Sequence, residues 1–360
     1  MSSGVFGYAA LNARVRAMYS SLLSEQEMLR LSDAADYQSL ISALKSTVYG
    51  PYLEDLKEQE LTPRRVISRI RGRLADAYYS VIHMAPRHAR PLLIQLYRYF
   101  EVGNLKAILR GIVTGPTPDL ETTHWEQVSD VLFPMGSLSV LPGRAMVEAG
   151  NVPAAIELLD GTRYEEALTF AMKRYSAEQN LFPLEVALDL EYWRQLWREA
   201  KRLSGLDREY ATRIIGSLLD MNNLMWAIRY RVYHKLSEEE LINYTLPFGY
   251  HVQDEDIRAI AAGADISTIV TRIYPDITNV NELLENPHSG LPLLEAQLRR
   301  HLIEQCLAAF LGNPFHIGIP LAFLLLTNYE IEDLTILLEA RSTNLPDEKF
   351  RPYLLRATEA

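Results

Sequence analysis

Three pairs of polar residues recur in this sequence at one helical spacing and at nearly even intervals. In each pair an acid stands three positions before an amide or a second acid: Glu101 and Asn104, Asp220 and Asn223, and Glu330 and Asp333. Residues three apart on a helix share a face, so each pair could act together on a proton or a ligand. An amide is neither an acid nor a base near neutral pH, which argues against acid–base catalysis. We interpret the six residues as structural repeat positions.

Asn104, Asn223 and Asp333 each lie on an otherwise apolar helical stripe. A polar side chain in that setting is expected to be buried and to need a hydrogen-bond partner. We expect this bond to fix how neighbouring helices cross. The substitution Asn104→Leu tests the interpretation, because loss of a partnered buried polar group should cost about 1–3 kcal/mol.

The other residues that could bind a metal or act as nucleophiles form no familiar motif. The eight histidines include no His-Glu-x-x-His, and His83 and His88 are five apart, which is not a one-face helical spacing. The single cysteine, Cys306, lies in an apolar run and resembles a small buried hydrophobe. Phosphate-binding glycine loops and the Gly-x-Ser-x-Gly elbow are absent from the sequence. We expect no catalytic residue, nucleotide, cofactor or metal, although a site assembled from distant residues would leave no motif.

Positive charge is concentrated between Thr62 and Arg90, where there are seven arginines and one acid, Asp76. At about 100° per residue, six apolar residues share one side of a helix: Val66, Ile67, Ile70, Leu74, Ala77 and Val81. The other side carries five basic residues, namely Arg64, Arg65, Arg69, Arg71 and Arg73. The simplest interpretation is a solvated basic face. The alternative is a docking face for an acidic partner or for anionic head groups, which charge reversal at Arg69 and Arg73 would weaken.

Composition limits the class of protein. The chain has 360 residues, of which 48% are hydrophobic and 23% charged, as in a soluble globular protein. A net charge of −10 argues against nucleic acid as the main partner. No run approaches the ~18 apolar residues of a membrane span. A lone cysteine and an N-terminus without a signal-peptide pattern fit a cytoplasmic location.

Helical periodicity extends over almost the whole chain and predicts an all-α fold. Pro91 and Gly115 lie 229 positions before Pro320 and Asn344, so two signature helices should begin at a proline and end at a residue that tolerates a positive φ. The middle copy has Tyr210 at the start and no glycine at the end. Short helices are expected after the first and second copies. Three similar helical units follow, at roughly 1–120, 121–240 and 241–360.

Several of these segments resemble one family, the C subunits of archaeal and bacterial A/V-type rotary ATPases, which are the counterparts of the d subunit of the eukaryotic vacuolar enzyme. The resemblance is carried by Phe6 to Met18, Thr47 to Leu53, Glu101 to Arg110, Glu330 to Leu338, and Asn344-Leu345-Pro346. The chain departs from the family pattern where Asn344 replaces a common glycine and Asp333 a common asparagine.

The resemblance implies a non-catalytic, funnel-shaped body of three helical repeats in a pseudo-threefold arrangement. It implies a peripheral position on the cytoplasmic side of the membrane, between the central stalk (D/F-type subunits) and the proteolipid (c/K/L) ring. There the protein would transmit torque for proton or sodium transport. Neither the coupling ion nor the direction of ATP chemistry can be predicted from the chain.

Two other classes remain open on the residues alone. One is a helical scaffold that joins soluble partners without a rotary role. The other is an enzyme whose site combines distant residues, which predicts a deep cleft with carboxyl groups of strongly shifted pKa. The rotary interpretation predicts instead a central opening lined by all three copies, with the stalk contacting its inner wall.

Overall fold

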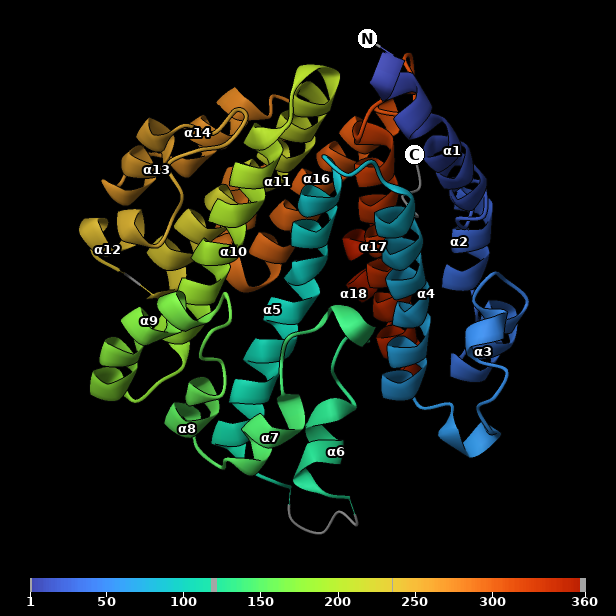
Figure 1. The fold of residues 1–360 in the computed structure, drawn as a ribbon, viewed down its shortest axis with the longest axis horizontal. Helices are drawn as coiled ribbons and strands as arrows, with labels where there is room; N and C mark the ends of the chain where they lie inside the picture. Colours follow the sequence, from blue (N-terminus) through green and yellow to red (C-terminus); the bar gives the residue numbers. More distant parts are fainter. Residues whose placement is uncertain (1, 118–121, 235, 357–360) are drawn as a thin grey trace.

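The computed structural model describes residues 2–117, 122–234 and 236–356, and these ranges contain 18 α-helices and no strand (Figure 1). The all-α prediction is confirmed. Six of the helices are long: α4 (Pro63–Met84), α5 (Arg90–Thr114), α10 (Phe182–Arg202), α11 (Gly205–Arg229), α16 (Pro287–Ala308) and α17 (Gly318–Ser342). The three signature pairs lie on α5, α11 and α17, which have 25 residues each.

The long helices form three hairpins, α4–α5, α10–α11 and α16–α17. Each helix contacts the next one in chain order, and α17 returns to contact α4, so the six helices form a closed cycle. In Figure 1, α17, in orange-red to red, accordingly lies beside α4 of the first hairpin. Proline occupies the first turn of the first helix in every hairpin, at Pro63, Pro183 and Pro287, where a missing N–H costs nothing.

The predicted helix ends are found in the first and third copies. Gly115 follows α5 with a φ of 74°, and Asn344 follows α17 with a φ of 52°. Both residue types tolerate this conformation. The middle helix, α11, lacks such a stop and continues into a π-helical turn at Tyr230–His234.

Pairs of short helices accompany the hairpins. After the first hairpin come α6 (His124–Ser129), α7 (Gly143–Glu148), α8 (Val152–Glu157) and α9 (Glu165–Glu178). After the second come α12 (Glu238–Asn243), α13 (Asp254–Ala261), α14 (Ile266–Ile273) and α15 (Val280–Glu285). The remaining helices are α1 (Ser2–Tyr19), α2 (Glu25–Ser32), α3 (Tyr37–Lys45) and α18 (Asp347–Phe350).

The N-terminal helices α2 and α3 have the same local construction as the pairs α7–α8 and α13–α14. The second helix of each pair is capped by an Asp or Asn side chain that accepts a backbone N–H three positions on, at Asp36, Asn151 and Asp265 (2.8, 2.9 and 2.8 Å). The same capped pair of short helices therefore also precedes the first hairpin.

The hairpin tips meet at α1. Tyr8 donates to Asp207 at the second tip (2.9 Å), and Asn12 and Arg16 donate to backbone carbonyls of Pro314 and Phe310 at the third (2.5 and 2.8 Å). Asp207 also contacts His88 of the first tip. In this way α1, near the N-terminal label in Figure 1, ties the three tips together.

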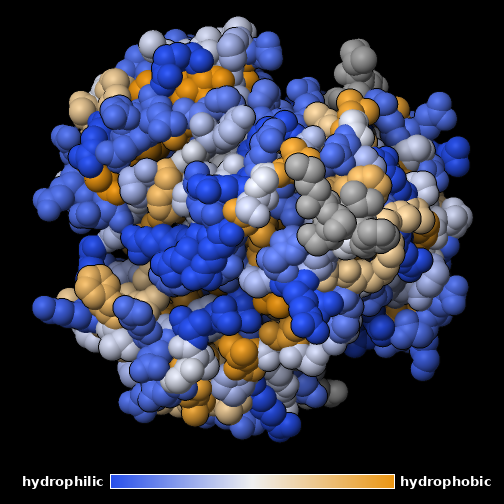
Figure 2. Space-filling view, turned by 45° about the horizontal axis from the view of Figure 1, so that its top comes forward, coloured by the Kyte–Doolittle hydropathy of each residue, from blue (hydrophilic) through white to orange (hydrophobic). Residues whose placement is uncertain are grey.

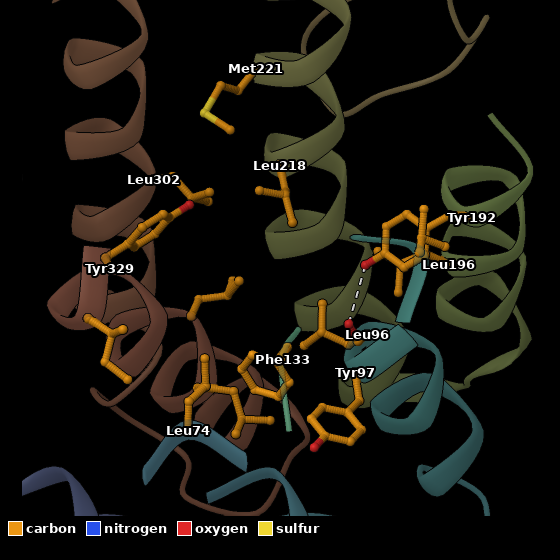
Figure 3. Packing of buried hydrophobic residues seen from close by; sticks show 14 of the residues in the cluster. Leu74, Leu96, Tyr97, Phe133, Tyr192, Leu196, Leu218, Met221, Leu302 and Tyr329 are labelled. Carbon is orange, nitrogen blue, oxygen red and sulfur yellow. Dashed lines mark hydrogen bonds between the residues drawn. The ribbon is translucent and has the colours of Figure 1, made fainter. Parts of the chain in front are cut away.

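Apolar side chains of different helices fill the space between the hairpins. Figure 3 shows Leu96, Leu218 and Tyr329 pointing toward one interior from α5, α11 and α17. Burial of each such side chain contributes about 1.5–3 kcal/mol. On the face in Figure 2, hydrophobic residues form only small separate patches among hydrophilic ones. Within the described ranges, no helix combines the length and the apolar character needed to cross a membrane.

Candidate functional site

Each signature acid is buried and binds a distant loop. On α5, Glu101 accepts hydrogen bonds from the backbone N–H of Val140 (2.6 Å) and from the hydroxyl of Tyr164 (2.6 Å). Arg98, one turn earlier, supplies a charge partner at 2.8 Å. Burial and the nearby carboxylate raise the pKa of Tyr164, so its hydroxyl stays a donor. Charged acceptors of this kind form strong hydrogen bonds.

Glu330 on α17 makes the same set of contacts, but with the beginning of the chain. Its carboxylate accepts the backbone N–H of Leu23 (2.7 Å) and the hydroxyl of Tyr49 (2.7 Å), and Arg356 is its charge partner. Burial raises the pKa of Glu330, and Arg356 opposes this rise most strongly. We call the contacts of a signature acid with its distant loop a joint. The joint at Glu330 connects the N-terminal segment to the C-terminal one.

Among the residues that the structure describes, Asp220 on α11 is bound by backbone groups alone. Its two oxygens accept the N–H groups of Tyr250, His251 and Val252 (2.8, 2.7 and 3.1 Å). Burial raises the pKa of Asp220, and these three N–H groups oppose the rise. A Cβ on Gly249 would lie 2.0 Å from Asp220 Oδ1, so the approach of this loop requires glycine.

The residue at the second position of each pair matches the hydrogen-bond donors and acceptors that its loop backbone presents. Asn104 donates to the carbonyl of Phe133 (2.9 Å) and accepts its N–H (2.7 Å). Asn223 does the same with Leu246 (3.0 and 3.1 Å). The residues are buried as expected. The expected role in helix crossing is wrong, however, because the partners are loop backbone groups.

Asp333 differs because its loop differs. Its two oxygens accept the N–H groups of Leu355 (2.7 Å) and Arg356 (2.8 Å). An amide here would place an NH₂ group against a backbone N–H, whereas a carboxylate satisfies both donors. The departure from asparagine at position 333 thus follows from the geometry of the partner.

A cavity of about 610 Å³ lies between the hairpins. Its wall includes Gly103 and Lys106 of α5, Glu332 of α17 and Asp189 of α10. A smaller neighbouring cavity is lined by all three signature helices, at Tyr99, Leu218 and Asn328 among others. These three residues each lie five positions before the second residue of a signature pair. The position five residues before the second member of each signature pair therefore faces one shared cavity.

A network of ion pairs crosses this interior. Lys106 pairs with Asp189 (2.7 Å), while Arg299 of α16 pairs with Glu295 (2.6 Å) and with Glu332. Burial raises the pKa of Asp189, and Lys106 opposes the rise most strongly. Each of these charged groups has a partner of opposite charge, so we regard the pairs as structural. They join α5 to α10 and α16 to α17.

Comparison with known proteins identifies the type of chain that has this construction. The family model described as ATP synthase (C/AC39) subunit matches residues 11–353. The chain belongs to this family. It is similar to proteins that carry the name of the C subunit of A-type ATP synthase. The example from Methanocaldococcus jannaschii is 23% identical over 353 residues, which cover 97% of this chain and 86% of the relative.

Two further relatives of the same name give similar values. The Methanobrevibacter smithii protein is 23% identical, with 98% of this chain and 88% of the relative covered. The Pyrococcus horikoshii protein is 23% identical, with 96% and 90% covered. The resemblance predicted from the sequence is confirmed, and this member of the C/AC39 family is a component of a rotary ATPase.

The five arginines of the predicted basic face do not lie together in this C/AC39 family member. Arg64 is exposed, and so are Arg65 and Arg69, which pair with Glu60 (2.6 Å) and Asp55 (2.8 Å). The other two are half-buried on different sides of α4. Whether the exposed three dock a partner remains a prediction.

The two half-buried arginines have different surroundings. Arg71 lines the 610 Å³ cavity. Arg73 donates to the carbonyl of Ser21 (3.0 Å) and lies over the ring of Tyr49, 5.2 Å from its centroid. The expectation that these two arginines belong to a solvated face is wrong. The N-terminal segment covers α4 at Arg73, and the hairpins around the cavity cover it at Arg71.

The tyrosine joints were missed from the sequence, although a local signal exists. Both tyrosines end the pattern Leu-x-x-Thr-x-Tyr, at Leu44 to Tyr49 and at Leu159 to Tyr164. In each, the Thr hydroxyl donates to the Leu carbonyl and accepts the Tyr N–H. This turn aims the ring at the signature acid.

Cys306 is fully buried, and burial raises the pKa of its thiol to about 12. A thiol so far from ionisation is a poor nucleophile. In the part of the chain that the structure describes, no three His, Cys, Asp or Glu side chains are grouped as metal ligands.

Proposed function

We propose that the chain is a non-catalytic subunit of the central rotor, which links the central stalk of the rotary ATPase to its membrane proteolipid ring and transmits torque. The observation that carries this proposal is the closed cycle of six long helices around an interior lined by equivalent positions of α5, α11 and α17. Such a body can receive a shaft on its axis. Membership of an ATP synthase subunit family supports the same role.

Three units, at roughly 1–120, 121–240 and 241–360, form a pseudo-threefold funnel in this proposal. The recurrent hairpin lengths, the three capped short helices and the three acid joints support it. The joint at Glu330 takes its loop and tyrosine from the N-terminal segment, so the third unit is completed by the start of the chain.

The position of the cavity gives the proposed funnel a direction. Its lining residues on α5 and α17 run from Tyr99 to Arg110 and from Asn328 to Ile336, from near the middle of each helix toward the end that lies away from the hairpin tips. The tips are tied by α1. We assign the cavity end to the foot of the D/F-type stalk, and the tip end to the proteolipid (c/K/L) ring on the cytoplasmic face of the membrane.

Polar joints suit a part that carries torque. Buried hydrogen bonds and ion pairs are directional, and a loop held by two or three of them has one well-defined position. The contacts of Glu101, Asp220 and Glu330 hold a loop against each signature helix in this way. The joints leave little freedom for the units to slip when the stalk turns.

Single-cysteine cross-linking tests the proposal, because the native Cys306 is fully buried and leaves a low background. Gly103→Cys places a thiol in the cavity, where a Cβ meets no atom within 4 Å. Leu206→Cys marks a hairpin tip (41% exposed), and Phe170→Cys marks the outer surface (86% exposed). Each variant is assembled into the membrane-bound ATP synthase and treated with a short bifunctional reagent.

We expect position 103 to cross-link to a stalk subunit, position 206 to the proteolipid, and position 170 to neither. A scaffold that joins soluble partners would give no proteolipid product and would purify without membranes. Stalk products from position 170 alone would overturn the assignment of the inner wall.

A further inference from the structure

Arg71 is a cation that has no partner among the described residues around the cavity. It lies on α4 between the buried residues Ile70 and Leu74, its side chain is half-buried, and it lines the cavity with Gly103 and Glu332. Within the described ranges it makes no hydrogen bond or ion pair, and the nearby Glu339 and Glu332 act on it only electrostatically. An arginine remains protonated in proteins, so this charge is permanent.

The other cations that line the cavity are all paired. Lys106 is bound to Asp189 (2.7 Å), Arg110 to Glu185 (2.6 and 2.8 Å), and Arg299 to its two glutamates. Pairing is what a half-buried charge requires, because desolvation penalises a charge that has no counter-ion. Among the cations that line the cavity, Arg71 is therefore the one to which an incoming acidic group would supply a counter-ion.

The cavity has room for such a group. Gly103 lines the same space, and a Cβ built there meets nothing within 4 Å. The volume of about 610 Å³ accommodates several side chains of an inserted helix end or loop. A carboxylate is the matching chemistry, since a planar guanidinium can hold its two oxygens in a bidentate pair.

We propose that Arg71 anchors the segment that enters the cavity by pairing with a carboxylate on that segment. The inference rests on the proposed function, which puts the stalk foot in this cavity, and it adds the chemistry of the contact. The partner segment must present an Asp or Glu side chain near its leading end. The pair would lie away from bulk water and so would fix the rotational position of the stalk in its socket.

The test measures binding of the purified central-stalk subcomplex of the same ATP synthase to variants of the full chain. Arg71→Met keeps an unbranched, largely apolar stem and removes the charge. Arg71→Lys keeps the charge but lacks the planar guanidinium that can hold both carboxylate oxygens. The matched control is Arg69→Met, two residues away on the same helix, where the guanidinium is exposed and pairs with Asp55. A fourth variant, Gly103→Trp, places a bulky ring in the cavity and obstructs it. Circular dichroism and melting temperature establish that each variant is folded.

We expect Arg71→Met to raise Kd about 30-fold or more, as for truncation of one member of a desolvated ion pair. Arg71→Lys should have a smaller effect and Arg69→Met almost none. Gly103→Trp should block binding. If Gly103→Trp blocks binding but Arg71→Met behaves like Arg69→Met, the role of Arg71 is wrong while docking in the cavity stands. Normal binding of Gly103→Trp overturns both the inner-wall assignment and this inference.

Discussion

Tyr49 donates its hydroxyl hydrogen to Glu330 across 2.7 Å, although 281 positions separate the two residues. The equivalent bond between Tyr164 and Glu101 (2.6 Å) spans 63 positions. One joint is thus made twice, once between neighbouring segments and once between the two ends of the chain. The second version adds a bond between α17 and the N-terminal segment to the packing of α17 against α4, which closes the cycle of helices.

Removal of this hydroxyl should loosen the closure. In Tyr49→Phe the buried carboxylate of Glu330 loses a donor, and we expect a cost of about 1–3 kcal/mol in the free energy of unfolding. The matched variant Tyr164→Phe should cost a similar amount, because Glu101 is equally buried. Melting temperature and urea denaturation of both variants measure the effect. An unchanged melting temperature for Tyr49→Phe would show that the hydroxyl contributes nothing to closure.

The two hydrogen bonds of Asn104 with the backbone of Phe133 give a second prediction. Asn104→Leu leaves the N–H and the carbonyl of Phe133 without partners in the interior, at a cost of about 1–3 kcal/mol for each lost group. Asn104→Asp should also be destabilising above pH 7, because a carboxylate oxygen then faces the carbonyl oxygen of Phe133. Chemical denaturation at pH 8 tests both. If the aspartate variant is as stable as the native chain, the assigned orientation of the amide is wrong.

Asp333 should make stability depend on pH. Burial raises its pKa to about 7, and the N–H groups of Leu355 and Arg356 oppose the rise. The pKa is higher in the folded chain than in the unfolded one, so the folded state binds the proton more tightly. The stabilisation is full below pH ~4 and is lost as the pH rises through about 7.

We therefore expect the free energy of unfolding to fall between about pH 4 and about pH 7, with a contribution from Asp333 of at most about 4 kcal/mol. Asp333→Asn removes the titrating group and should flatten this part of the curve. Buried Asp220 and Glu330, whose pKa values are also raised, remain in both proteins, so the difference between the two curves isolates Asp333. Parallel curves would contradict the assignment.

Charge reversal on α4 should lower the melting temperature much less at the exposed Arg69 than at the packed Arg73. Arg69→Glu breaks an exposed pair with Asp55, and such pairs contribute about 0–1 kcal/mol. Arg73→Glu removes the contacts with Ser21 and the Tyr49 ring and places a second acid near Glu330, so it should lower the melting temperature by several degrees. Binding of a partner at the exposed arginines would show as salt-dependent loss of affinity in Arg69→Glu alone. Equal melting temperatures for the two variants would contradict the placement of Arg73.

The sequence predicted those parts of the fold that depend on local chemistry. Proline starts, a glycine or asparagine stop and apolar spacing gave the long helices because each of these acts within one or two turns. Burial of Asn104 and Asp333 followed from the apolar stripes around them. The family followed from the order and spacing of such segments.

What could not be predicted depends on contacts between distant segments. Helical periodicity placed Arg71 and Arg73 opposite the apolar face of α4, but it carries no information about which elements cover that side. Likewise, Leu23 and Tyr49 gave no sign of their partner, because Glu330 lies about 300 positions later. The repeated Leu-x-x-Thr-x-Tyr pattern would have revealed the third short-helix segment, since the same turn recurs at Tyr164.

The closure at Glu330 also sets an order of events during synthesis. Tyr49 leaves the ribosome early, and its partner is made 281 residues later, about 14–56 s at roughly 5–20 residues per second. Throughout that interval α3 has no α17 to pack against, and its apolar side is exposed to other nascent chains. Release of a full-length polypeptide is therefore required before the body can close, and a prematurely terminated product would be a target for chaperones and proteases instead of a competitor for assembly.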